Sequence, residues 1–307
     1  MASRVRKAPH RVSAVSKDNA IFKGKKEVEH QLKILNVRPN RVRGQNFLLD
    51  KTFLSKIFGC VGDVTGRHVV EIGAGLGALT EYFSSVESLT LIEIEPKFVE
   101  QLRVKYPSAR VLEADVTTVN FSEIASYPEP RIPNCKGFCP LVVIGNLPYS
   151  QTTDILFHIL THRFVIERAV FLLQKEVAER LASSPNGRVY GVPSVMVQAV
   201  AKVTLGPIIS GDAFFPSAEV KSRVVILEFE NADSLGGYCY NKFSKVVHAA
   251  FCKRRKMIHN SLRASGLYTA EQVEAALLAS NILRDRRAET LSVKDYLALA
   301  TELEKTN

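Results

Sequence analysis

Long apolar runs and paired cysteines are both missing from this 307-residue sequence. No apolar stretch approaches the roughly 18 residues that a membrane-spanning helix needs, which argues against a protein that crosses a bilayer. The five cysteines are scattered, with no paired CxxC clusters, so neither a disulfide framework nor a structural zinc site is expected. His158 and His162 are four residues apart but have no third ligand nearby in sequence, and we expect no metal site. This cysteine usage fits reduced thiols in an intracellular compartment, for which the cytoplasm is the first expectation.

Internal repeats and low-complexity stretches are also absent. The composition, 46% hydrophobic and 23% charged, is that of a globular protein. The length is enough for a full core, and it suggests one large domain with a smaller one, or two domains. With no sequence feature that indicates self-association, we expect a monomer.

Acidic residues are scarce in two segments, which makes the charge of the chain uneven. The net charge is +10, but residues 1–44 carry twelve Lys or Arg against three acids, and residues 241–263 carry seven against none. The remainder therefore has a net charge of −6. Segregated basic segments are typical of a protein that presents a basic surface to a polyanion, and nucleic acid is the first candidate. A solvated tail and one charged helix are the structural alternative.

Residues 1–26 predict a flexible basic arm, because they contain Ser, Lys and Arg with little apolar periodicity. This composition resembles an organellar transit peptide, which would place the protein in a mitochondrion or plastid. It fits an RNA-binding arm, or a tail with no role, equally well. Residues 27–38 can form a short amphipathic helix that Pro39 stops.

A rhythm of strands and helices begins near residue 67, and it predicts a parallel sheet with helices on both faces. Strands are expected at 67–73, 88–95, 109–115, 141–146 and 167–174, and helices at 76–85, 96–106, 153–161 and 175–184. Two further strands, near 195–204 and 222–230, are expected to form an antiparallel hairpin at the sheet edge. From residue 241 onward only helical periodicity remains. The expected organisation is an arm at 1–26, an α/β domain at 27–231 and a small helical domain at 232–307.

The first strand ends in a glycine-rich turn, residues 73–77. Glycines at a strand–helix turn let the backbone approach a ligand closely, and the helix N-terminus offers free N–H groups. The pattern Gly73-x-Gly75-x-x-Ala78 also satisfies the dinucleotide fingerprint. By itself it therefore fits a dehydrogenase as well as any other enzyme with a nucleotide cofactor.

Acidic residues end the next two strands. Glu93 ends the second, where a carboxylate can accept hydrogen bonds from ribose hydroxyls, although Glu95 competes for that role. Asp115 ends the third and is placed to reach an adenine amino group. Together with the glycine turn, these residues predict a nucleoside-binding crevice at one edge of the sheet.

Asn146-Leu147-Pro148-Tyr149 follows the fourth strand, at the sheet edge where open α/β proteins bind ligands. The Asn146 side-chain carbonyl is an acceptor, and Pro148 biases Leu147 towards an extended conformation that can turn its carbonyl outward. Two acceptors can hold one exocyclic amino group, and Tyr149 adds a flat ring for base stacking. A plain loop is the structural alternative, since Asn and Pro are common in turns.

This tetrapeptide suits methyl transfer to the N6 amine of adenine. That amine is a poor nucleophile because its lone pair is delocalised into the ring. Acceptors that favour a more tetrahedral nitrogen free the lone pair for attack. No strongly basic side chain is needed, because positioning and electrostatics can supply most of the rate.

In their order along the chain, these motifs resemble those of the rRNA adenine N6,N6-dimethyltransferases of the KsgA type, from about residue 28 to the C-terminus. The landmarks are residues 44–50 (GQNFLLD), 71–77 (EIGAGLG), Glu93, Asp115, 146–149 (NLPY), 214–216 (FFP) and 250–256 (AFCKRRK). The resemblance implies an α/β fold, a Rossmann-like class I S-adenosylmethionine-dependent methyltransferase domain with a small C-terminal all-α domain that binds rRNA. The implied activity is dimethylation of two adjacent adenosines near the 3′ end of small-subunit rRNA, in ribosome biogenesis.

The resemblance also implies a role for each matching position. S-adenosylmethionine would be bound by Asn46, Leu48, Gly73, Gly75, Gly77, Glu93, Asp115 and Asn146. The target base would be held by Asn146, Leu147, Pro148 and Tyr149, with Phe214 and Phe215 as the opposite wall, although one of these two is expected to be core. Phosphates of rRNA, in a partly assembled ribosomal subunit, would be bound by Lys253, Arg254, Arg255 and Lys256.

The stretch after Phe-Phe-Pro departs from the family, which usually continues with a second proline, a basic residue and an acid. Residues 217–222 (SAEVKS) invert the charge at two positions, which concerns the local loop geometry. Three alternatives stay open: a large-subunit rRNA methyltransferase of the antibiotic-resistance type, which usually has Ile before the proline; an organellar transcription factor on the same scaffold; and an NAD-dependent dehydrogenase.

Overall fold

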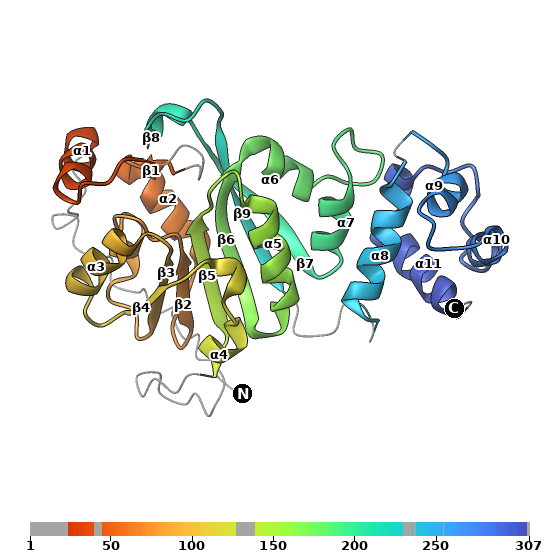
Figure 1. The fold of residues 1–307 in the computed structure, drawn as a ribbon, viewed down its shortest axis with the longest axis horizontal. Coiled ribbons are helices and arrows are strands. Elements are labelled where there is room, and N and C mark those ends of the chain that lie inside the picture. The colour runs from red at the N-terminus through yellow and green to blue at the C-terminus, as the bar shows by residue number, and fades with distance from the viewer. Residues whose placement is uncertain are drawn as a thin grey trace, which may run out of the picture.

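The computed structural model describes residues 24–39, 45–126, 139–229, 235, 238–253 and 255–305. The predictions for residues 1–23, Cys135 and Arg254 lie outside these ranges. Within them, a seven-stranded sheet has the order β4-β3-β2-β5-β6-β9-β7 (Figure 1). Its strands are β2 (His68–Ile72), β3 (Leu89–Glu93), β4 (Arg110–Glu113), β5 (Leu141–Asn146), β6 (Ile166–Gln174), β7 (Ala201–Ile209) and β9 (Ser222–Phe229).

The first five strands of this order are parallel, whereas β9 pairs antiparallel with both β6 and β7. The predicted antiparallel edge is therefore confirmed. The strand expected near 195–204 is partly wrong, because α7 (Val192–Gln198) is a helix and β7 begins only at Ala201. The apolar, β-branched run 195–200 mimics a strand, but Pro193 in the first turn after Gly191 favours a helix start.

The helix expected over 76–85 is reduced to a single 3₁₀ turn, η1 (Thr80–Phe83). Gly75 and Gly77 adopt φ values of +53° and +80°, which a right-handed helix does not accommodate. The folded structure requires glycine at position 77. A Cβ atom at Gly77 would lie 2.8 Å from Cε2 of Tyr106, so the ring occupies the space that a larger residue would need.

Helices cover both faces of the sheet, as the alternation of elements predicts (Figure 1). One face packs in a buried cluster with α2 (Lys51–Val61) and α3 (Pro96–Lys105). The other packs with α4 (Phe121–Ala125), α5 (Thr152–Thr161), α6 (Lys175–Leu181) and α7. Short 3₁₀ turns are η2 (Val116–Thr118), η3 (Arg163–Val165) and η4 (Gly211–Ala213).

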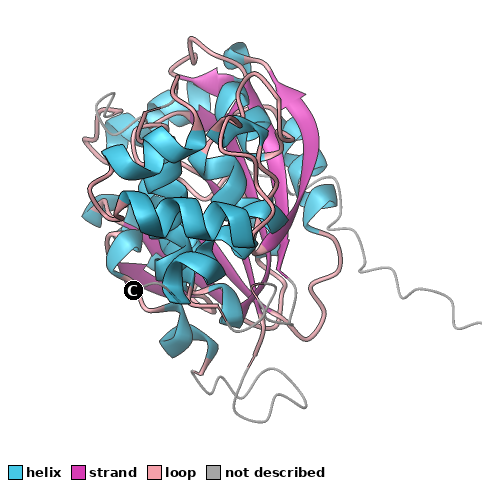
Figure 2. Ribbon diagram, turned by 90° about the vertical axis from the view of Figure 1, so that its right-hand side faces the viewer, coloured by secondary structure: helices cyan, strands magenta, loops and turns pink. Residues whose placement is uncertain are grey.

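The C-terminal part is helical, as expected. It contains α8 (Tyr240–Phe251), α9 (Ile258–Ala264), α10 (Ala270–Ala279), η5 (Ala288–Thr290) and α11 (Val293–Lys305), which stand in front of the sheet in Figure 2. Its core is continuous with that of the helices α5 to α7. The Tyr190 hydroxyl donates to the Leu291 carbonyl at 2.9 Å, and the Asn186 N–H donates to the Glu289 carbonyl at 2.8 Å. The two parts are therefore packed as one body rather than tethered by a linker.

The N-terminal α1 (Lys25–Ile34) lies against the sheet edge that carries the glycine turn. Val28 and Leu32 pack there with Leu76 and Phe98. Next to it, β1 (Phe47–Leu48) pairs antiparallel with β8 (Phe214–Phe215), so that two segments far apart in the sequence close over the same edge (Figure 1). None of the helices in the described ranges has the length and apolarity needed to cross a membrane.

Candidate active site

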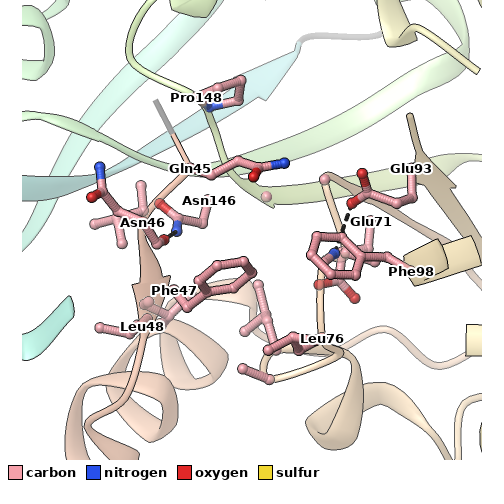
Figure 3. Close-up of a pocket in the computed structure, with 18 of the residues that line it drawn as sticks. Gln45, Asn46, Phe47, Leu48, Glu71, Leu76, Glu93, Phe98, Asn146 and Pro148 are labelled. Atoms are coloured by element: carbon pink, nitrogen blue, oxygen red, sulfur yellow. Dashed lines mark hydrogen bonds between the residues drawn. The ribbon is translucent and has the colours of Figure 1, made fainter. Parts of the chain in front are cut away.

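A cleft opens at the carboxyl ends of β2, β3 and β5 (Figure 3). Residues expected to bind the cofactor line it, from both the N-terminal segment and the sheet: Asn46, Leu48, Gly73, Gly75, Glu93 and Asn146. The structure thus brings together residues that are a hundred positions apart in the chain.

The glycine turn forms one side of this cleft with its backbone. The Gly73 N–H donates to the Ile92 carbonyl and so continues the β2–β3 pairing, while its φ of +68° takes the chain out of the strand conformation. A Cβ atom at Gly75 would be 3.3 Å from the Phe47 ring. Glycine at these positions therefore lets both the backbone and the Phe47 ring approach the cleft.

Glu93 lies at the end of β3, and its carboxylate is fixed by three backbone donors. Oε2 accepts from the Gly75 N–H at 2.8 Å, and Oε1 accepts from the N–H groups of Ile94 and Glu95 at 2.9 and 3.0 Å (Figure 3). Burial raises the pKa of Glu93, and the three N–H donors oppose this rise. Of the two acids considered for ribose binding, Glu93 lines the cleft and Glu95 does not.

Glu71 is a second carboxyl group in the cleft, which the sequence reasoning did not single out as a site residue. Its side chain is only 2% exposed and its Oε2 accepts from the Thr80 hydroxyl at 2.6 Å. Burial, with a smaller contribution from the charge of Glu93, raises its pKa to about 8. The signal was present in the sequence, because an acid inside a strand that is otherwise apolar is costly unless it serves a site.

Asn146 is oriented by the N-terminal segment. Its Nδ2 donates to the backbone carbonyl of Asn46 at 2.8 Å (Figure 3). This bond uses the amide nitrogen, and it leaves Oδ1 as the side-chain group that can accept a proton donor from a ligand. The Asn46 side chain points away from the centre of the cleft in Figure 3, so its backbone is the part that acts on Asn146.

The rest of the tetrapeptide forms a hydrogen-bonded turn into α5. Leu147 is buried, and its N–H donates to the Leu172 carbonyl at 3.3 Å. The Pro148 carbonyl accepts from the Thr152 hydroxyl and the Gln151 N–H, and Pro148 lines the cleft. Tyr149 is half-buried just outside the cleft, where its hydroxyl shares a hydrogen bond of 2.6 Å with Ser222 Oγ.

The two phenylalanines of β8 differ in burial. Phe214 is 2% exposed and belongs to the core cluster under α2, so it is the core member that the sequence allowed for. Phe215 is partly buried against α1, with the Lys25 ammonium 5.6 Å from its ring centroid. Phe215 is the less buried of the two and does not line the cleft, so its role as a wall of the target site stays a prediction.

Two residues expected at the cofactor do not line the cleft. Gly77 is turned towards α3, and its carbonyl accepts from the Tyr106 hydroxyl at 3.0 Å. Asp115 follows β4 and uses Oδ1 to accept from the N–H and hydroxyl of Thr117, at 2.9 and 2.8 Å. Gly77 packs against Tyr106, and its role at the cofactor, like that of Asp115 at an adenine ring, stays a prediction.

Among the residues that line the cleft without having been predicted are Gln45, Phe47 and Phe98. The Gln45 side chain extends over the cleft between Asn146 and Glu93 (Figure 3). The rings of Phe47 and Phe98 meet edge to face, with centroids 5.8 Å apart. Gln45 and Phe47 belong to the quoted GQNFLLD motif, but Phe98 becomes a site residue only through the packing of α3 beneath α1.

The basic cluster after α8 forms an exposed turn. Lys253, Arg255 and Lys256 are exposed, while Arg254 lies outside the described residues. The Lys253 N–H donates to Ser261 Oγ at 3.1 Å, and the Lys256 N–H donates to the Lys253 carbonyl at 2.8 Å. The backbone of the turn is thus held, with its charges in solvent.

Comparisons with known proteins identify the family of this chain. A family model described as ribosomal RNA adenine dimethylase matches residues 36–305. Among curated relatives, the ribosomal RNA small subunit methyltransferase A of Chlorobium chlorochromatii is 37% identical over 270 residues, covering 88% of this chain and 95% of its own. The protein of the same name from Acidobacterium capsulatum is 34% identical over 265 residues, covering 85% and 90%.

Solved structures support the fold. A dimethyladenosine transferase from Plasmodium falciparum superposes with a TM-score of 0.70 at 20% identity, covering 84% of this chain and 98% of its own. The 23S rRNA methyltransferase ErmE superposes with a TM-score of 0.61 at 24% identity, covering 84% and 100%. At these identities the similarity concerns the architecture, a Rossmann-like methyltransferase sheet with a C-terminal helical region.

Proposed function

Because the chain belongs to the ribosomal RNA adenine dimethylase family, we propose that it is an S-adenosylmethionine-dependent methyltransferase that dimethylates the N6 amine of adenosine in small-subunit rRNA. The substrate is two adjacent adenosines near the 3′ end of that RNA, in a partly assembled subunit, and the enzyme acts as a monomer in ribosome biogenesis. Family membership also removes the dehydrogenase alternative, which only the glycine spacing supported.

The residues of the cleft fit the cofactor. A nucleoside needs close backbone approach and a hydroxyl acceptor, which Gly73, Gly75 and the buried Glu93 carboxylate supply. Asn46 and Leu48 cover the same cleft from β1, and Asp115 follows the neighbouring strand. When bound, S-adenosylmethionine supplies an activated methyl group.

One observation carries the proposed reaction, the hydrogen bond from Asn146 to the Asn46 carbonyl. It fixes the amide so that Oδ1 is the acceptor on offer beside the cofactor cleft. An acceptor there holds an exocyclic amine by its N–H groups and favours the tetrahedral nitrogen that attack requires. Tyr149 and Phe215 supply flat surfaces for a base drawn out of its stack. The chain uses positioning rather than a strong base.

The test is methyl transfer from labelled S-adenosylmethionine to small ribosomal subunits that lack adenine dimethylation, with large subunits assayed in parallel. Nucleosides are analysed by mass after digestion, with Asn146→Ala as the site control. We expect N6,N6-dimethyladenosine from the wild type and a loss of at least about 100-fold in the variant. Product in large-subunit rRNA instead would assign the antibiotic-resistance type. Cofactor binding without transfer to either subunit would favour a nucleic-acid-binding factor.

The compartment follows from where the substrate is assembled. We propose the cytoplasm, with a mitochondrion or plastid as the alternative if residues 1–26 act as a targeting segment. Fusing these residues to a fluorescent reporter separates the two, because only a targeting segment directs the reporter to an organelle.

A further inference from the structure

Ser222 links the tetrapeptide to the opposite wall of the target site. Its hydroxyl shares a 2.6 Å hydrogen bond with the hydroxyl of Tyr149, and the residue is fully buried. The two residues are 73 positions apart. Neither the glycine turn nor the cofactor cleft involves Ser222, so its bond to Tyr149 needs a separate explanation.

The sheet order explains how the two side chains meet. Tyr149 follows β5, and β6 lies between β5 and β9. Because β9 is antiparallel to β6, its first residue lies where β6 ends, and Ser222 pairs with Gln174, the last residue of β6. The Tyr149 side chain therefore reaches across the end of β6 to β9. If β9 ran parallel to β6, its last residue rather than its first would lie beside the end of β6.

Ser222 is itself held firmly. It also pairs with Ile209 of β7, so its backbone sits between two strands. Just before it, the Lys221 carbonyl accepts from the Lys175 N–H at 2.9 Å. The preceding loop is closed where the Ala218 N–H donates to the Gly211 carbonyl at 3.0 Å, and the Ser217 hydroxyl donates to the same carbonyl at 3.2 Å. The segment that departs from the family pattern is thus well fastened.

The same segment carries the second wall. Phe215 lies seven residues before Ser222, and its strand β8 is paired with β1. The hydrogen bond between the hydroxyls of Tyr149 and Ser222 thus connects one proposed wall, the Tyr149 ring, to the segment that carries the other, the Phe215 ring.

We propose that Ser222 is a positioning residue for the target base. Resting on the proposed function, the inference is that the Ser222 hydroxyl holds the Tyr149 ring in the plane on which the target adenine stacks, so that N6 meets Asn146. The effect acts through the hydroxyl of Tyr149 alone. Loss of this hydroxyl bond is therefore expected to lower the turnover of bound substrate. It should have little effect on binding of the ribosomal subunit, because that binding depends on a much larger surface.

A double-mutant cycle tests the tie. Ser222→Ala, Tyr149→Phe and the double variant are compared in methylation of small subunits that lack dimethyladenosine. We expect each single variant to lower kcat about 10-fold with KM changed by less than about 2-fold. The double variant is expected to match the singles, because either change breaks the same bond. Ser222→Thr, which keeps a hydroxyl, is expected to restore most of the rate.

Ser194→Ala is the matched control, since Ser194 is also fully buried and donates to a backbone carbonyl, that of Arg180 at 2.6 Å. It is expected to lower the melting temperature and leave kcat intact. Additive losses in the double variant would overturn the inference, as would full activity in Tyr149→Phe, which does not depend on the folding of Ser222→Ala. A wild type that makes no dimethyladenosine would instead reject the proposed function.

Discussion

The side-chain amide of Asn146 donates a 2.8 Å hydrogen bond to the backbone carbonyl of Asn46, a hundred residues earlier in the chain. The contact joins the segment that covers the cofactor cleft to the residue proposed to hold the target amine. The acceptor is a backbone atom, so the identity of the Asn46 side chain does not determine it. The pairing of β1 with β8 keeps that carbonyl in place.

Asn146→Asp tests the orientation of this amide. A carboxylate cannot donate to the Asn46 carbonyl. One of its oxygens would face the carbonyl oxygen, so that two acceptors would repel each other. We expect the methylation rate to fall by at least about 100-fold, even though an acceptor oxygen is retained. Single-turnover methylation of small subunits measures the loss. A rate near that of the wild type would show that the amide nitrogen is dispensable.

Glu93→Gln tests the ribose acceptor. The substitution replaces one carboxylate oxygen with an amide nitrogen, which cannot accept from the Gly75 N–H or from a ribose hydroxyl. We expect the affinity for S-adenosylmethionine, measured by calorimetry, to fall about 10-fold to 100-fold. Glu95→Gln is the control, because its side chain does not line the cleft. Equal losses in both variants would contradict the assignment.

Glu71 makes the stability of the protein depend on pH. Its pKa rises from 4.5 to about 8 on folding, so at neutral pH the folded state holds a proton that the unfolded chain releases. The free energy of unfolding therefore falls as pH rises between these values, by up to about 1.4 kcal/mol per pH unit. Urea unfolding from pH 5 to pH 8 is expected to show this fall in the wild type and a flatter profile in Glu71→Gln. Glu100→Gln, which changes an exposed carboxyl group, is the reference variant. The same pH dependence of the free energy of unfolding in the wild type and in Glu71→Gln would contradict the prediction.

Gly77→Ala separates packing from ligand contact. The new Cβ atom would lie 2.8 Å from Cε2 of Tyr106, at a φ of +80°. We expect the free energy of unfolding to fall by about 1–3 kcal/mol. Gly59→Ala in α2 meets no atom within 4 Å and should instead stabilise the helix by about 0.5–1 kcal/mol. Chemical denaturation of both variants measures the contrast, and a neutral Gly77→Ala would contradict it.

The basic turn after α8 is tested by removing charge. The double variant Lys253→Ala, Lys256→Ala loses two exposed cations. We expect weaker binding to small subunits and a dependence of log affinity on log salt that is shallower by about 0.7–0.9 per lysine. Lys305→Ala, in which the lost ammonium is paired with Glu302, is the comparison. An unchanged salt dependence would show that these two lysines do not contact RNA phosphates.

The sequence by itself determined the alternation of strands and helices that builds the parallel part of the sheet, and the helical C-terminus. It also showed the glycine and NLPY motifs. These features can be read locally, because the period of apolar residues and the turn residues are local signals. It also placed Glu93 and Asn146 at one edge, since parallel strands end together. It could not separate the helix at 192–198 from a strand, because residues 194–197 are consecutively buried and so hide the helical period.

The tertiary structure alone decided which side chains meet. Gly77 packs against Tyr106, Phe98 joins the cleft beneath α1, and Phe214 is fully buried in the core whereas Phe215 is only partly buried. The contact of Asn146 with Asn46 joins segments 100 residues apart, and the contact of Tyr149 with Ser222 joins segments 73 residues apart. Their geometry comes from strand order and direction in the folded sheet, which no local pattern of residues encodes.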